Sequence, residues 1–183
     1  ETIRRNLIMP LVTDEYLSLL KQVHAEEEGG WGVTAAGKFY WKIELAIDHL
    51  KPKTLLDYGS GAGRLKARLS KDYPKLIVHE YEPSNPDKSG PGYPSDLVVC
   101  IDVLEHVEPE CLDDVLIDLE RCVLNKGYFT VALYKASRIL PDGRNAHLIV
   151  KPLDWWKQKL ETKFRILNYK EQRKTGIFVV SSK

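Results

Sequence analysis

The chain has 183 residues, the size of one domain with a single hydrophobic core. Hydrophobic residues make up 43% of it and charged residues 29%, which excludes a disordered or collagen-like chain. No apolar run approaches the roughly 20 residues of a membrane helix, so we expect no membrane partner. Three cysteines without C-x-x-C spacing indicate a reducing, cytoplasmic environment and no disulfide or zinc framework.

The formal net charge of +1 at pH 7 is unevenly distributed. Residues 151–183 contain nine basic and three acidic side chains. A basic segment of this kind can contact phosphates. It is also typical of the solvated face of a helix and a strand, which is the interpretation we favour.

Two helices are predicted ahead of the first strand. Thr13 can cap the first helix, which should end near Gly29, and the second ends before Pro52. We expect residues 1–52 to form an N-terminal helical cap and residues 53–183 to form the core of the same single domain.

Beyond the cap, short apolar runs alternate with segments of helical periodicity. This alternation predicts an α/β fold, a parallel sheet with helices on both faces and a ligand site beyond the carboxyl ends of the strands. The last two strands look like an antiparallel pair. The expected strands are 54–58, 76–81, 96–102, 128–134, 164–169 and 177–181, and the expected helices are 64–72, 112–123 (ended by Asn125-Lys126-Gly127) and 155–160.

A glycine-rich loop between the first core strand and the next helix is the strongest motif. It reads Asp-Tyr-Gly-Ser-Gly-Ala-Gly over residues 57–63. Glycines permit positive φ and a close approach of backbone N–H groups to a ligand, and the helix N-terminus adds partial positive charge. Arg64 stands where a dinucleotide-binding loop needs its third glycine, and no Gly-Lys-Ser/Thr follows for a P-loop.

An acidic residue follows the second predicted strand. Glu82 lies about 20 residues past the glycines, where a carboxylate can accept hydrogen bonds from both hydroxyls of a ribose. Tyr81 and Pro83 flank it and are placed to pack against a base. The loop and this acid together favour an adenosine-containing ligand.

These two motifs and the run DLVVCIDVLEHV resemble the class I S-adenosylmethionine-dependent methyltransferases over about residues 55–133. The resemblance implies a Rossmann-like sheet of seven strands with an antiparallel last strand, and S-adenosyl-L-methionine as the cofactor. It also implies that the loop lines the methionine portion and that Glu82 holds the ribose. The expected cofactor-binding residues are Asp57, Tyr58, Gly59, Ser60, Gly61, Gly63, Tyr81, Glu82, Pro83, Asp102 and Val103.

The sequence departs from this family after the ribose acid. Only the proline-rich stretch 83–95 precedes the next strand, too little for the helix and third strand that family members usually have. We therefore expect a sheet shortened at this edge, and no residue that recognises the adenine amine can be named.

Acidic and histidine side chains gather where the next strand ends. Asp102, Glu105, His106 and, in a later loop, His147 offer ligands that suit Mg²⁺ or Mn²⁺, and such a metal would lower the pKa of a bound acceptor hydroxyl. The alternative is that His106, with Glu105, is a catalytic base or cofactor-pocket residue without a metal.

The same pattern resembles two methyltransferase subfamilies. Ubiquinone-biosynthesis O-methyltransferases carry E-x-x-E-H, and small-RNA 3′-terminal 2′-O-methyltransferases carry it with a later histidine. Asp102 stands where both have Glu, and the Leu-Glu-His triplet also occurs in methyltransferases without a metal. The sequence leaves both roles of these residues open.

Aromatic residues supply the candidates for the acceptor side. Trp31 could cover the cofactor, and Tyr40 and His147 are the other expected substrate residues. We expect one of Trp155 and Trp156 to pack on the sheet and the other to border the acceptor pocket.

The predicted function is methyl transfer from S-adenosylmethionine to a hydroxyl or amine of a small-molecule or nucleotide-like acceptor. The first alternative is metal-assisted 2′-O-methylation of RNA ribose, although the chain has no strongly basic overall charge. The second is a cofactor-binding partner subunit without activity of its own.

Overall fold

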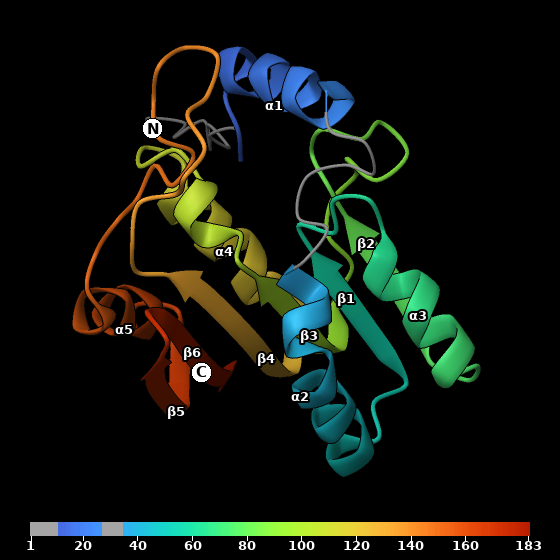
Figure 1. Ribbon diagram of the computed structural model, residues 1–183. Helices are drawn as coiled ribbons and strands as arrows, with labels where there is room; N and C mark the ends of the chain where they lie inside the picture. Colours follow the sequence, from blue (N-terminus) through green and yellow to red (C-terminus); the bar gives the residue numbers. More distant parts are fainter. Residues whose placement is uncertain (1–10, 27–34) are drawn as a thin grey trace, which may run out of the picture.

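Six strands form one sheet in the order β2-β1-β3-β4-β6-β5 in the computed structural model, which describes residues 11–26 and 35–183 (Figure 1). The first four strands are parallel, and β6 runs antiparallel to both of its neighbours, as predicted. The strands are β1 Thr54–Tyr58, β2 Ile77–Tyr81, β3 Ser95–Ile101, β4 Val123–Ala132, β5 Phe164–Gln172 and β6 Thr175–Ser182; the helices are α1 Asp14–Glu26, α2 Ala35–Leu50, α3 Arg64–Asp72, the 3₁₀ turn η1 Leu104–His106, α4 Leu112–Cys122 and α5 Leu153–Glu161.

The sheet is shortened at the β2 edge, as the proline-rich stretch predicted. Residues 82–94 contain no helix or strand, so β2 is the edge strand, and the sheet has six strands instead of the seven that the resemblance implied. Proline has no backbone N–H and cannot donate to a ladder, which explains why this stretch adds no strand.

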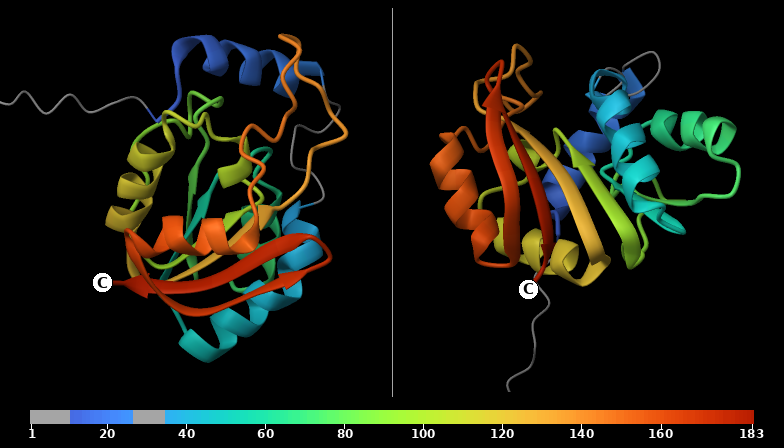
Figure 2. Two further views of the ribbon diagram at one scale, coloured as in Figure 1. Left: turned by 90° about the vertical axis from the view of Figure 1, so that its left-hand side faces the viewer. Right: turned by 90° about the horizontal axis from the view of Figure 1, so that it is seen from below.

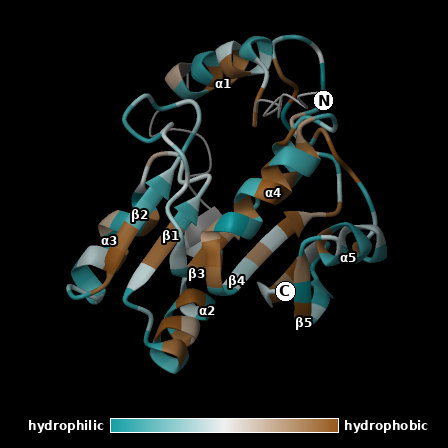
Figure 3. Cartoon of the chain, turned by 180° about the vertical axis from the view of Figure 1, so that it is seen from behind, coloured by the Kyte–Doolittle hydropathy of each residue, from teal (hydrophilic) through white to brown (hydrophobic). Residues whose placement is uncertain are grey.

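Helices cover both faces of the sheet. Buried side chains of α4 and α5 pack on one face, and those of α2 and α3 pack on the other. Figure 2 shows α2 and α5 on opposite sides of the strands. Successive strand residues face opposite layers, with Leu55 in the α2 layer and Leu56 in the α4 layer. Burial on both sides agrees with the hydrophobic run of β3 from residue 97 to 101 (Figure 3).

The first helix packs on a loop instead of on the sheet. Tyr16 and Val23 of α1 are buried against the segment between β4 and α5, beyond the carboxyl ends of the parallel strands (Figure 1). Thr13 caps α1 as predicted, because its Oγ1 accepts a hydrogen bond from Tyr16 N. Thr13 N and Oγ1 donate to the buried carboxylate of Glu108, which ties α1 to the turn after η1.

Two expectations about the N-terminal region are left as predictions. The expected end of the first helix near Gly29 lies outside the described residues, where α1 is described to Glu26. The division into a cap over 1–52 and a core over 53–183 also stays a prediction.

The predicted end of the fourth helix is wrong. Residues 125–127 are not a helix stop: α4 ends at Cys122 and β4 begins at Val123. Gly127 lies inside β4 opposite Val180, where the facing side chains leave no room for a Cβ. The glycine therefore reflects close packing across the sheet and not a left-handed cap.

The three cysteines lie in the core. All three are free and buried, which agrees with a core role for their thiols.

None of the helices described in the structure combines the length and apolarity needed to cross a bilayer.

A substitution at Gly127 tests this packing. A Cβ there would lie 2.7 Å from Val180 Cγ2 and 2.8 Å from the Phe129 ring, so Gly127→Ala should lower the free energy of unfolding by about 1–3 kcal/mol. Gly37→Ala is the matched control, because nothing lies within 4 Å of its Cβ and alanine favours the helix by about 0.5–1 kcal/mol. Urea unfolding of both variants is the measurement, and equal effects would contradict the packing argument.

Candidate active site

The glycine loop between β1 and α3 requires its glycines. Gly59, Gly61 and Gly63 have φ of +81°, +48° and +76°, a region that other residues rarely adopt. A Cβ on Gly59 would overlap the side chain of Val103, which follows β3. The loop is fastened to the end of β2, because Gly59 N and Ser60 N both donate to the carbonyl of Tyr81, at 2.8 and 3.0 Å.

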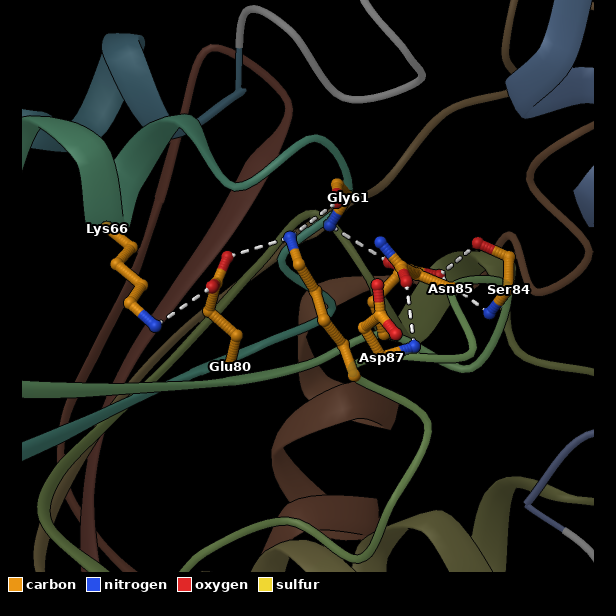
Figure 4. A network of polar contacts seen from close by, with 8 residues as sticks. Gly61, Lys66, Glu80, Ser84, Asn85 and Asp87 are labelled. Carbon is orange, nitrogen blue, oxygen red and sulfur yellow. Dashed lines mark hydrogen bonds and ion pairs between the residues drawn. The ribbon is translucent and has the colours of Figure 1, made fainter.

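Glu82 meets this loop, as the spacing predicted. Its buried carboxylate accepts a hydrogen bond from Gly61 N at 2.9 Å through Oε2. Its other oxygen accepts from Ser84 N at 3.2 Å and from Ser84 Oγ at 2.7 Å (Figure 4). These donors fix the carboxylate beside the positive-φ glycines and leave it further lone pairs for a ligand.

A second ionic group, which sequence reasoning missed, supports the loop. Glu80 forms ion pairs with Lys66 of α3 at 3.3 Å and with Lys88 at 2.9 Å (Figure 4). Lys88 Nζ also donates to the carbonyl of Gly61 at 3.4 Å. Lys88 comes from the proline-rich stretch, which folds back so that Glu82 N donates to the Lys88 carbonyl. The available signal was that Lys88 is the lone basic residue between Glu82 and Ser95.

Asp57 is a buried carboxyl at the end of β1. Burial and the nearby carboxylates of Glu80 and Glu82 raise its pKa from 3.8 to about 7, while Lys88 opposes the shift. Its carboxyl has no hydrogen-bond donor among the described residues. Asp57 is therefore suited to pair with a cationic group of a ligand.

The other residues expected to bind the cofactor fall into two groups. The Tyr58 side chain lies in the core, where its hydroxyl donates to Asp118 of α4 and its ring packs on Tyr81 at 4.6 Å. With its side chain in the core, Tyr58 offers the loop its backbone, and its part in cofactor binding stays a prediction. Ser60 Oγ is buried without a partner in the described part of the chain, and Pro83 is half-buried next to Glu82.

The end of β3 holds a strained residue. Asp102 has φ +51°, which is uncommon outside glycine, and its N–H donates to the carbonyl and Oγ1 of Thr130 on β4. Thr130 Oγ1 in turn donates to Asp102 Oδ1 at 2.5 Å. This clamp turns the chain so that Val103 lies against Gly59.

Glu105, His106 and His147 come together although 40 residues separate the two histidines. One ligand atom from each lies within 4.8 Å of the other two. Asp102, which we expected among the metal ligands, is not in this group, and its carboxylate is used by Thr130 instead. Three of the four predicted residues therefore form the cluster.

Backbone groups orient all three side chains. Ala132 N donates to Oε1 of Glu105 at 2.8 Å, while Oε2 is buried without a partner among the described residues. The Nδ1 atoms of His106 and His147 lie 2.7 and 2.5 Å from the carbonyls of Ala146 and Tyr134. Because a carbonyl can only accept, Nδ1 is the donor in each ring.

Burial shifts the protonation of this cluster. Desolvation, with the nearby Asp102 carboxylate, raises the pKa of Glu105 well above its usual range. Desolvation and the neighbouring His147 lower the pKa of His106 to about 4. His106 is therefore a neutral imidazole at pH 7, the form in which histidine binds metals.

The fold is shared with solved methyltransferases. A 1,6-didemethyltoxoflavin-N1-methyltransferase from Burkholderia thailandensis, with bound 1,6-didemethyltoxoflavin and S-adenosylhomocysteine, has a TM-score of 0.61 at 14% identity over 96% of this chain and 92% of that one. A structure concerned with conversion of a disulfide bond into a thioacetal group during echinomycin biosynthesis has a TM-score of 0.67 at 13% identity. That match covers 91% of this chain and 93% of the other. The mitomycin 7-O-methyltransferase has a TM-score of 0.56 at 13% identity, and the match covers 92% of this chain and 54% of that one. This is the class I methyltransferase fold.

The likeness lies in three-dimensional structure alone. No protein-family model and no curated protein matches the sequence. The methyltransferase fold nevertheless places the glycine loop, Glu82 and the Glu105–His106–His147 cluster at the carboxyl end of the strands, where ligands bind in such sheets.

The aromatic candidates are divided between core and site. Tyr40 is buried between α2 and α3, and its hydroxyl donates to Asp72 at the end of α3, so the structure does not bring it to the site. Trp31 lies outside the described residues. Trp156 is wholly buried in the core, as expected for one of the pair, whereas Trp155 lines a pocket beside His147; that a Trp borders the acceptor stays a prediction.

The raised pKa of Asp57 predicts a pH dependence of stability. Between about pH 4 and pH 7 the folded protein keeps a proton that the unfolded chain releases, so the free energy of unfolding falls as pH rises through this window. At about 1.4 kcal/mol per pKa unit, the contribution is about 4 kcal/mol.

Denaturant unfolding at several pH values measures this effect. Asp57→Asn should flatten the decline, whereas Asn at the exposed Asp87 should leave it unchanged. An unaltered slope in Asp57→Asn would contradict the assignment.

Proposed function

We propose that this protein is an enzyme that transfers the methyl group of S-adenosylmethionine to a hydroxyl group of an acceptor. The observation that carries the proposal is the hydrogen bond from Gly61 N to the buried carboxylate of Glu82, which joins a positive-φ glycine loop to a ribose-type acid. The methyltransferase fold supports the same conclusion.

The residues of the loop fit each part of this cofactor. Glu82 would accept hydrogen bonds from the ribose hydroxyls, because its carboxylate is already held in place and has further lone pairs. Asp57 would pair with the ammonium of the methionine portion, which relieves the cost of its burial. Gly59 and Gly61 let the backbone approach the ligand closely. S-adenosylmethionine supplies a methyl group on a cationic sulfur, and this chain positions the acceptor for in-line displacement.

The Glu105–His106–His147 cluster forms the acceptor side of the proposed site. Two imidazole Nε2 atoms and the unpartnered Oε2 of Glu105 fit a divalent cation, with Mn²⁺ favoured over Mg²⁺ by the imidazoles. Such a cation would lower the pKa of a bound acceptor hydroxyl. The low basicity of buried His106 favours this role over that of a general base.

Three alternatives are separated by simple observations. A partner subunit without activity would bind S-adenosylhomocysteine but, when purified alone, would label no acceptor. Metal-assisted methylation of RNA ribose uses the same cluster, and its product would be destroyed by ribonuclease. Methyl transfer to an amine acceptor would not depend on a metal.

Calorimetry with S-adenosylhomocysteine tests the cofactor assignment. Glu82→Ala should weaken binding by about 10–100-fold, the cost of losing hydrogen bonds from a charged acceptor. Glu82→Gln keeps the shape and should lie between wild type and alanine. Glu171→Ala, at an exposed position of β5, is the control and should bind normally. No heat with a well-folded wild-type chain would reject the proposal.

Metal dependence tests the acceptor side. EDTA should abolish methyl transfer, and added Mn²⁺ should restore it. In direct Mn²⁺ titrations followed by electron paramagnetic resonance, His147→Ala should weaken binding by about tenfold or more. His49→Ala, at the exposed end of α2, is the control. Transfer that persists in EDTA would remove the metal from the proposal.

A further inference from the structure

A pocket of about 410 Å³ opens beside the cluster. It lies between the start of α4, the helix α5 and the segment 145–151 that precedes α5. His147 lines it and also belongs to the Glu105–His106–His147 cluster, so the pocket and the cluster share a wall. A molecule whose hydroxyl reached the cluster would therefore extend into this pocket.

The pocket is electropositive. Lys135, Lys151 and Lys159 line it, and no acidic residue does. Lys159 is neutralised by an ion pair with Asp113 at 2.5 Å. Lys135 and Lys151 have no carboxylate partner among the described residues. Two positive charges are thus left for an anionic ligand.

The remaining walls are apolar. Trp155, Leu112 and Ile149 contribute to them, and the Lys151 ammonium lies 5.8 Å from the centre of the Trp155 ring. Apolar walls with a few polar groups are the usual composition of a small-molecule site. An aromatic or other apolar body would pack against Trp155 while a charged group met the lysines.

We propose that the acceptor carries a phosphate monoester, which binds between Lys135 and Lys151 while the body of the acceptor packs against Trp155. A phosphate monoester carries about −1.5 to −2 charges at pH 7, which matches two cations better than a single carboxylate does. This inference rests on the proposed methyltransferase function, since it names the acceptor of that site.

An acid near the pocket argues for a small acceptor over RNA. Asp114 stands in the first turn of α4, two residues after Leu112 of the pocket wall, and adds negative charge that a continuing phosphate chain would meet. One cationic pocket fits one terminal phosphate, whereas RNA needs a continuous basic track.

Binding of phenyl phosphate to the full chain tests the pocket. In nuclear magnetic resonance titrations it should shift the indole N–H of Trp155, and phenol should bind at least about tenfold more weakly. Lys135→Met with Lys151→Met should lower the affinity by about tenfold, while the double Arg variant retains it. Lys71→Met with Lys75→Met, at exposed positions near the end of α3, is the control. Equal binding of phenol, or equal loss in the control, would overturn the proposal.

Methyl transfer identifies the source of the phosphate. With methyl-labelled cofactor and a metabolite extract, prior phosphatase treatment should remove the labelled product, and ribonuclease should not. The Lys135→Met, Lys151→Met variant should transfer at least about tenfold less while binding S-adenosylhomocysteine normally. Product that survives phosphatase, or is lost with ribonuclease, would overturn the proposal.

The two proposals fail in different ways. If wild type does not bind S-adenosylhomocysteine, the proposed function is rejected, and with it the assignment of the phosphate to an acceptor. If it binds S-adenosylhomocysteine but not phenyl phosphate, the pocket assignment alone is rejected.

Discussion

A single hydrogen bond, from the backbone N–H of Gly61 to the buried carboxylate of Glu82, organises the proposed cofactor site. It joins the loop after β1 to the residue that follows β2, and it requires φ values that only glycine adopts readily. The loop then leaves Asp57 buried among carboxylates, at a cost in stability. A cationic ligand would offset this cost. A buried carboxyl with a raised pKa is more typical of a binding site than of a structural turn.

The proposed acceptor side depends on backbone groups. Tyr134 and Ala146 accept the Nδ1 protons of His147 and His106, and Ala132 N donates to one oxygen of Glu105. Preorganisation of this kind places ligands without help from neighbouring side chains. Since the same segment between β4 and α5 carries both carbonyls, the fold of that segment decides whether the site exists.

The missing third strand has a structural substitute. The proline-rich stretch after β2 brings Lys88 back to Glu80 and to the carbonyl of Gly61, and Lys66 of α3 binds the same carboxylate. These ion pairs hold the glycine loop at the β2 edge, where the resemblance implied a further strand. The shortened edge therefore keeps the glycine loop tied to β2 and α3 with fewer residues.

The sequence by itself determined the elements and the cofactor loop, because both are local: strand burial, helical periodicity and glycine spacing act over a few residues. It therefore predicted α3 from Arg64 to Asp72, the shortened edge and the partnership of the loop with Glu82. It misjudged residues 125–127, because the need for glycine there arises from Val180, which lies far away in the chain. Only the tertiary structure showed that the Asp102 carboxylate bonds to Thr130 and that Lys135 and Lys151, without carboxylate partners among the described residues, line one pocket, since these features depend on contacts between distant segments.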